Sequence, residues 1–388
     1  MPVIVGDGSG DSKMQGDGKG VSVGSTTTTG RNAGVSTATG TLVFNEDAGA
    51  VQVYTGNTDG WSNVGGGNKV AATGGDATYE LGGYKYHVFT SSGSLAVSAA
   101  GDVEFLIVGG GGGAGAGEST DYGRSGGGGG AGGLRCSFDG ETPGGPGAGS
   151  EPAFTVSAGV TYPVTIGNGG TGRSGSTDGD DGTPSSFGPP SAPGRIIAGG
   201  GGGGGGGRND PGNNGGCGGG ASAQEQNGSP NTSYPGPQNL GGEGAATGSG
   251  FNPIVAGYDG GRCAAETNVG GGGGGATEAG EDGQDDGSAA AEGKGGLGMR
   301  FPTDMIPSDY GTTGPQPGRY FAQGGYASAE NNGGTYAAGG GGGANPQHWT
   351  SSQGPAAASN TGGGGGGKGD SQTGGNGGSG IVFIRYET

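Results

Sequence analysis

The sequence predicts a mainly β and irregular protein, in which small β modules are followed by a packed bundle of polyglycine II helices connected by long polar loops. Glycine supplies 115 of the 388 residues, whereas its average share is about 7%. Only 28% of residues are hydrophobic, which excludes a conventional multidomain enzyme with roughly 45–50% apolar residues. A helical protein is excluded as well, because glycine costs about 1 kcal/mol per helical position relative to alanine.

Composition divides the chain into successive regions. Thr41–Phe44 and Val51–Tyr54 are short β runs around a turn-rich loop, so they predict a hairpin. Tyr84–Phe89 alternates in the way expected of a half-buried strand. The expected regions are an extended Gly/Ser/Thr-rich arm at 1–40, a β-hairpin module and attachment region at 41–70, a β-strand region at 71–108, the polyglycine II bundle with its loops at 109–380 with an extra strand near 161–166, and a C-terminal β-strand at 381–388.

The glycine runs admit two interpretations. Disorder is one, because glycine loses the most backbone entropy on folding and buries no side chain. The other is a bundle of extended left-handed helices with three residues per turn, whose amides and carbonyls must all bond to neighbouring helices. Pure glycine blocks separated by loops with aromatic residues favour the bundle. The uninterrupted runs are Gly109–Gly113, Gly126–Gly130, Gly199–Gly207, Gly270–Gly275, Gly339–Gly343 and Gly362–Gly367.

Charge and cysteine usage exclude several kinds of partner. The formal net charge is −18, and a chain without a basic block does not bind nucleic acid through its phosphates. The cysteines Cys136, Cys217 and Cys263 are odd in number and have no CxxC spacing, so neither a disulfide framework nor a zinc site is expected. No secretion signal and no membrane-inserting segment are predicted either.

No catalytic constellation is apparent, so we expect neither enzymatic activity nor a cofactor. His87 is expected on a strand face, and glycine runs match dinucleotide-binding patterns trivially. The acidic cluster Asp178–Asp181 lacks the bidentate glutamate that ends a calcium loop, and the cluster Glu278–Glu292 has no fixed spacing. Solvated loops therefore explain them better than a metal site.

An ordered set of motifs carries a resemblance to a known family. The set resembles the glycine-rich domain of bacteriophage tail-fibre and other virion proteins, over roughly residues 84–388. The bundle is similar to the polyglycine II tip adhesins of T-even-type long tail fibres, from which this chain departs in its irregular run lengths and its N-terminal region. The motifs are Phe105-Leu-Ile-Val-Gly-Gly-Gly-Gly-Gly113, the run beginning at Gly126, Tyr162-Pro-Val-Thr-Ile-Gly-Asn-Gly-Gly170, Pro184-Ser-Ser-Phe-Gly188, Ile197-Ala-Gly-Gly-Gly-Gly202 and Gly378-Ser-Gly-Ile-Val-Phe-Ile-Arg-Tyr386.

Two groups of residues are predicted to carry the function. Glycines inside the runs form the scaffold: Gly109, Gly126, Gly203, Gly272, Gly341 and Gly364. Aromatic residues between the runs, where a glycine bundle offers no deep core, are expected to bind a receptor or a partner chain, since rigid rings give contact area at low entropic cost. They are Tyr234, Tyr258, Tyr310, Tyr320, Phe321, His348 and Trp349.

The resemblance implies a phage virion protein, a tail fibre or receptor-binding adhesin that presents variable loops and is made in the host cytoplasm. Its partners would be a bacterial cell-surface receptor, protein or glycan, and other tail or fibre proteins. The sequence leaves open a homotrimer beside a single chain. The alternatives are a structural virion or filament subunit whose loops contact neighbouring subunits, and an ice-binding protein.

Overall fold

The computed structural model describes residues 25–30, 39–46, 50–54, 60–63, 69–117, 125–138, 151–189, 194–207, 210–223, 257–263, 269–283, 292–328, 343, 353–369 and 372–388. The chain forms two compact units, one of residues 1–71 with 99–101 and the other of residues 72–98 and 102–388. Among the described residues, no helix is long and apolar enough to cross a membrane.

The first unit contains a four-stranded sheet with the order β1-β2-β3-β4. Strand β1 (Ser25–Thr26) is parallel to β2 (Leu42–Asn45), and β3 (Ala50–Tyr54) and β4 (Trp61–Asn63) follow in antiparallel pairing. The β2–β3 pair is the hairpin that the sequence predicts. Within this sheet the rings of Tyr54 and Trp61 meet edge to face with centroids 5.4 Å apart.

The second unit contains two larger sheets and two strand pairs. One sheet has six strands, in the order β10-β9-β19-β7-β6 with β11 paired to β9, and the other has the order β14-β13-β12-β8-β5. The bounds are β5 Ala71–Gly74, β6 Ala77–Leu81, β7 Tyr84–Phe89, β8 Gly93–Ala99, β9 Gly101–Val108, β10 Leu134–Cys136, β11 Phe154–Val156, β12 Thr161–Thr165, β13 Ser185–Phe187, β14 Ile196–Ala198 and β19 Ile381–Glu387, with the pairs β15 (Glu292–Gly293)–β18 (Ala327–Ser328) and β16 (Met299–Phe301)–β17 (Arg319–Phe321).

The last strand, β19, lies in the middle of the six-stranded sheet. It is antiparallel to both β9 and β7, with Ile384 opposite Phe105 on one side and His87 on the other. Residues 86–89 of β7 are all buried, so the half-buried pattern predicted for this strand is wrong. The alternation is lost because this strand is covered on both faces over these four residues.

Aromatic side chains fill the space around this sheet. Phe383 of β19 packs edge to face on Phe321, with ring centroids 5.9 Å apart, and on Tyr310 at 5.4 Å. The Arg385 guanidinium lies 3.8 Å from the ring centroid of Phe138 and donates to Glu104 at 2.6 Å. A buried cation is stable here because aromatic faces and a carboxylate surround it.

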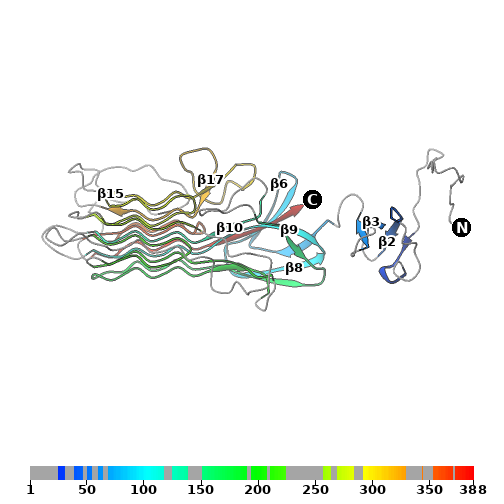
Figure 1. Ribbon diagram of the computed structural model, residues 1–388, viewed down its shortest axis with the longest axis horizontal. Coiled ribbons are helices and arrows are strands. Elements are labelled where there is room, and N and C mark those ends of the chain that lie inside the picture. Colours follow the sequence, from blue (N-terminus) through cyan, green and yellow to red (C-terminus); the bar gives the residue numbers. More distant parts are fainter. Residues whose placement is uncertain are drawn as a thin grey trace, which may run out of the picture. The chain divides into compact units, whose positions relative to one another are not determined.

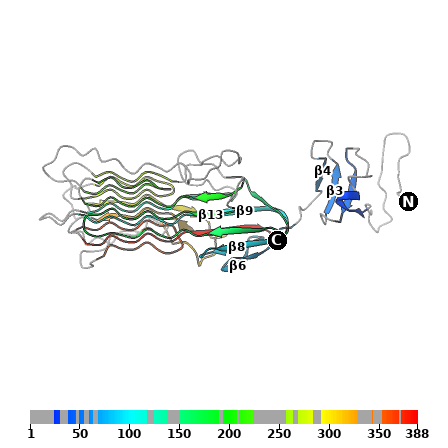
Figure 2. The same cartoon turned by 90° about the horizontal axis from the view of Figure 1, so that it is seen from below.

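Strands of these sheets continue directly into the glycine-rich part of the chain. Figures 1 and 2 show, from two directions, extended segments that run side by side away from the sheets. Strand β9 continues as segment 109–117, β10 is preceded by segment 126–133, and β14 continues as segment 199–207. We call these extended stretches glycine segments. The chain is thus mainly β and irregular, as the sequence predicts.

Hydrogen bonds between glycine segments repeat every three residues. In segment 109–117 the amides of residues 109–116 point in turn to three neighbours, and every third residue reaches the same neighbour, whereas the Gly117 amide donates to the Lys368 carbonyl. The first neighbour accepts through the carbonyls of Gly133, Gly130 and Gly127, from the amides of Gly109, Gly112 and Gly115. The second accepts through those of Thr183, Asp180 and Thr177, from Gly110, Gly113 and Ala116. The third accepts through those of Gly378 and Gly375, from Gly111 and Ala114.

The carbonyls of the same segment are shared among three further neighbours. They accept from Gly201, Gly204 and Gly207, from Gly170 and Arg173, and from Gly365. Segment 109–117 is therefore hydrogen-bonded to six other stretches of chain. Because each net hydrogen bond contributes about 1 kcal/mol and an unmet buried amide costs more, this lateral network replaces side-chain packing as the main constraint on the region.

Glycine is required wherever a segment is enclosed by others. A Cβ atom built on Gly112 would collide with the carbonyl of Gly202, and one built on Gly203 with the carbonyl of Gly179. These obstacles are backbone carbonyls of other segments, and that of Gly202 also accepts from the Gly130 amide, so they cannot move aside as the end of a flexible side chain can. Gly199, in the same run, differs, because a Cβ there would lie 3.6 Å from the Cα of Gly216, an ordinary contact.

This difference gives a matched test within one run. Gly203→Ala should destabilise the protein by about 3 kcal/mol or more, since overpacking here displaces backbone. Gly199→Ala should leave stability unchanged or raise it by roughly 0.4–1 kcal/mol through reduced unfolded-state entropy. Thermal or denaturant unfolding measures both, and equal effects of the two substitutions would contradict the enclosed position of Gly203.

A second test concerns His87, which is buried in β7. Its Nδ1 donates to the carbonyl of Gly74 at 2.7 Å, and its Nε2 lies 3.1 Å from the Tyr386 hydroxyl oxygen. Burial lowers the pKa of His87 below its ordinary value. The unfolded chain therefore binds the extra proton below a pH of about 6.5, and this contribution to stability is lost as the pH falls.

We expect the wild type to exceed His87→Gln in free energy of unfolding by an amount that shrinks below a pH of about 6.5, by at most about 1.4 kcal/mol per pH unit. Free energies of unfolding measured from about pH 7.5 to about pH 5, a range that includes the ordinary histidine pKa, would show this change. Carboxylates titrate in both proteins and cancel in the difference. Parallel curves would mean that His87 accepts a proton in the folded state.

Candidate functional site

The glycine segments have a common end away from the sheets. Gly117 forms a bridge with Gly207 there, and Ser125 with Gly369. The amides of Ala223 and Gly270 donate to the backbone carbonyl and the hydroxyl of Ser125, at 3.0 and 2.7 Å. We call this the free end of the bundle. Segments whose ends lie here include 109–117, 199–207, 217–223, 269–275 and 362–369.

One connection at the free end is described completely. Residues 174–177 turn the chain from segment 167–173 into segment 177–183, with Ser176 at φ 63° and the Thr177 hydroxyl donating to the Ser174 carbonyl at 2.9 Å. The connection is short and its residues are polar. It shows how the bundle holds a loop by both of its ends on adjacent segments.

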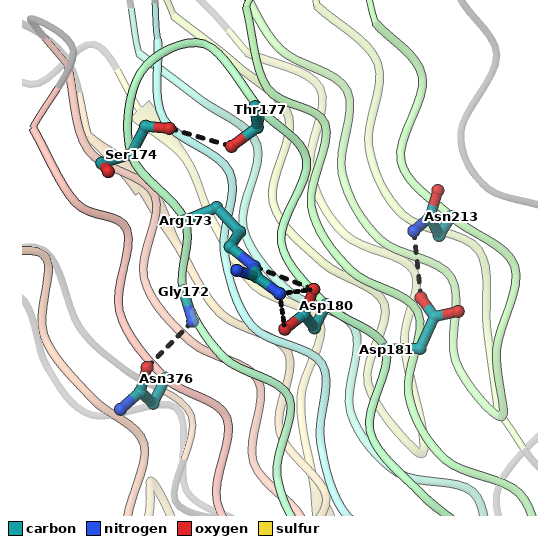
Figure 3. A network of polar contacts seen from close by, with 8 residues as sticks. All are labelled: Gly172, Arg173, Ser174, Thr177, Asp180, Asp181, Asn213 and Asn376. Carbon is teal, nitrogen blue, oxygen red and sulfur yellow. Dashed lines mark hydrogen bonds and ion pairs between the residues drawn. The ribbon is translucent and has the colours of Figure 1, made fainter.

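A polar side face runs along the edge of the bundle. Figure 3 shows its network, in which Arg173 donates to Asp180 at 2.7 and 2.9 Å and the Gly172 amide donates to the Asn376 side-chain oxygen at 2.9 Å. The side chains of Arg173 and Asp180 are 51% and 40% exposed. At this exposure the ion pair contributes about 1 kcal/mol or less. The pair therefore adds little to the stability of the bundle.

Polar side chains complete the hydrogen bonding of segments at the edge. The Gly203 and Gly206 amides donate to the carboxylates of Asp181 and Asp178, at 2.8 and 2.6 Å. The Arg262 amide similarly donates to Asp282 at 2.7 Å. Where no backbone carbonyl faces an edge amide, a carboxylate or amide side chain supplies the acceptor.

This role of the acidic residues was missed by sequence reasoning, which assigned the cluster Asp178–Asp181 to a solvated loop. A signal was present: Gly179 and Gly182 are three residues apart, as an extended segment with one enclosed face requires.

Burial together with the neighbouring Asp178 raises the pKa of Asp210 above its ordinary value. Among the described residues no group of three or more histidine, cysteine, aspartate or glutamate side chains is arranged to hold a metal ion.

The predicted scaffold glycines that are described all face backbone. A Cβ on any of them would collide with a carbonyl of another segment, namely that of Gly199 for Gly109, Gly115 for Gly126, Gly179 for Gly203, Lys294 for Gly272 and Gly129 for Gly364. Gly341 lies outside the described residues.

The described aromatic residues lie in a different setting from the exposed loops expected for them. Phe321 is fully buried and Tyr320 is 4% exposed, so neither ring is available to a receptor. Tyr310 is half-buried, and its hydroxyl faces that of Tyr79 at 2.8 Å. The expectation of no deep core was wrong here, because the sheets and the 302–318 connection form one beside the bundle.

Tyr258 lies within a glycine segment and is half-buried, with its carbonyl accepting from the Gly218 amide at 3.0 Å. Tyr234, His348 and Trp349 lie outside the described residues. The receptor-binding role of these four residues therefore remains a prediction.

Asn376 offers a test of edge completion. Asn376→Ala removes the acceptor of the Gly172 amide, which belongs to a buried residue, and should cost about 1–3 kcal/mol. Thr171→Ala, at an exposed position of the neighbouring segment, should change stability by less than about 0.5 kcal/mol. Unfolding curves for both variants measure this. A cost for Thr171→Ala equal to that for Asn376→Ala would show that the amide bond is not what matters.

Comparison with known proteins gives one family. A family model described as a glycine-rich domain matches residues 90–387, which comprise the greater part of the chain. Curated proteins give no match.

Proposed function

We propose that this chain, which belongs to the glycine-rich domain family, has a binding function. It would act as a rigid bundle that presents loops at its free end. Within that function the most specific assignment is a phage tail fibre or receptor-binding adhesin, as the resemblance implies. The single observation that carries the binding function is the common end at which the glycine segments are left and re-entered.

The finer fold assignment belongs to this proposal. We assign the glycine segments as polyglycine II helices, because the repeat of three residues and the six hydrogen-bonded neighbours of segment 109–117 match that geometry. At about 3.1 Å per residue the nine residues of 199–207 would span about 28 Å. Such a length separates the free end from the sheets.

The second unit has a polarity that suits display. Its first strand β5 and its last strand β19 meet at the sheets, where the Ala72 amide donates to the Tyr386 hydroxyl at 3.2 Å. Whatever holds the unit through its two ends holds it at the sheets. The free end then points away from the attachment and is available to a partner.

Rigidity supplies the binding advantage. A loop fixed at both ends on hydrogen-bonded segments loses less entropy on binding than a free one. Several copies on one particle would raise the avidity further. The proposed partners are a bacterial surface receptor and other virion proteins, the proposed location is the virion, and no enzymatic step is needed.

The test replaces a stretch between two glycine runs and compares it with a control beside the sheets. Replacing residues 344–352, which contain His348 and Trp349, with a Gly/Ser sequence of equal length should slow adsorption of particles to bacterial cells roughly ten-fold or more. The control is Ser308→Ala with Asp309→Ala, at exposed positions beside the sheets, which should adsorb as the wild type does.

Particle composition distinguishes the alternatives. Normal incorporation with slow adsorption supports the adhesin. Loss of the chain from particles would instead identify the replaced residues as subunit contacts, and unchanged adsorption would remove 344–352 from the binding surface.

A further inference from the structure

Among the described residues, five stretches of backbone are hydrogen-bonded to segment 199–207 and six to segment 109–117. The five are 109–117, 126–133, 177–183, 210–216 and 217–223. On the remaining side no backbone carbonyl receives the amides of Gly203 and Gly206. They donate instead to the carboxylates of Asp181 and Asp178.

These carboxylates lie between two segments. Asp181 belongs to 177–183, and the oxygen that accepts from Gly203 also accepts from the side-chain amide of Asn213, at 3.1 Å, in 210–216. Asp181 is exposed and Asp178 is half-buried. The acidic side chains therefore close, from the solvent side, the position that a sixth segment would occupy.

The two amides have the spacing that another glycine segment would satisfy. Gly203 and Gly206 are three residues apart, and on another side of the same segment Gly201 and Gly204 donate to the carbonyls of Gly110 and Gly113, with the same spacing. A glycine segment of a second copy carries the same row of carbonyls. Open rows of amides invite this kind of addition at sheet edges, and inward-pointing charges prevent it.

We propose that Asp178 and Asp181 stand in for a sixth segment, and so keep this side of the bundle from pairing with a glycine segment of a second copy of the chain. Their oxygens occupy the acceptor positions, and the incoming carbonyls find no free amide. This role is independent of receptor binding at the free end.

The experiment compares two double variants of the full chain. Asp178→Ala with Asp181→Ala removes the acceptors, and Asp178→Asn with Asp181→Asn keeps an oxygen at each position while removing the charge. The alanine variant should self-associate with a dissociation constant roughly ten-fold or more below that of the wild type, measured by sedimentation velocity over a concentration series. The asparagine variant should behave as the wild type does.

Hydrogen exchange at Gly203 and Gly206 provides the second readout. In the alanine variant these amides should exchange faster when the protein is dilute and regain protection as it associates. Asp180→Ala is the matched control, because Asp180 binds Arg173 through its side chain rather than an edge amide. It should change neither readout.

Three results would overturn the proposal. An alanine variant that stays as dissociated as the wild type would show that the carboxylates exclude no partner. Association of the asparagine variant to the same extent would assign the effect to charge alone. Association without renewed protection of Gly203 and Gly206 would place the contact elsewhere. If the double alanine variant unfolds, Asp178→Ala and Asp181→Ala are judged separately by the same criteria.

Discussion

Lateral hydrogen bonding between backbones is the constraint on which the second unit depends. An extended glycine segment makes no hydrogen bonds within itself, so each enclosed amide and carbonyl must find a partner on another segment. Six neighbours can approach segment 109–117 only because side chains are absent from its enclosed positions. Alanine is accommodated at Ala114 and Ala116, which are themselves fully buried, so the requirement applies position by position.

The sheets provide what the glycine segments lack. A bundle without side chains has little apolar area to bury. The hydrophobic effect scales with that area, so it contributes little to the stability of the bundle itself. Strands β9, β10, β14 and β19 are continuous with glycine segments and carry buried side chains such as Leu106, Leu134 and Phe383. The apolar core therefore fixes where each segment begins, and hydrogen bonding then holds the segments in register.

Sequence reasoning predicted the parts that depend on strict local patterns. The β2–β3 hairpin follows from two short β runs around a turn-rich loop, the strand at 381–386 from a run of apolar residues, and the enclosed positions of Gly109 and Gly203 from pure glycine blocks. The burial of Phe321 did not, because it depends on contact with Phe383 of a distant strand. Asp178 was also misjudged: the spacing of Gly179 and Gly182 indicates an extended segment, but which amide lies opposite Asp178 depends on the distant segment 199–207.

The central place of β19 bears on the order of folding. Its partners β7 and β9 emerge from the ribosome some hundreds of residues earlier, with Tyr86 opposite Arg385 and Glu104 opposite the same residue on the other side. Until residues 381–387 are made, these two strands lack the strand that joins them, and pairing so distant in sequence is slow to find. The nascent chain must therefore keep two unpaired strand edges out of contact with other chains until β19 is synthesised and pairs with both.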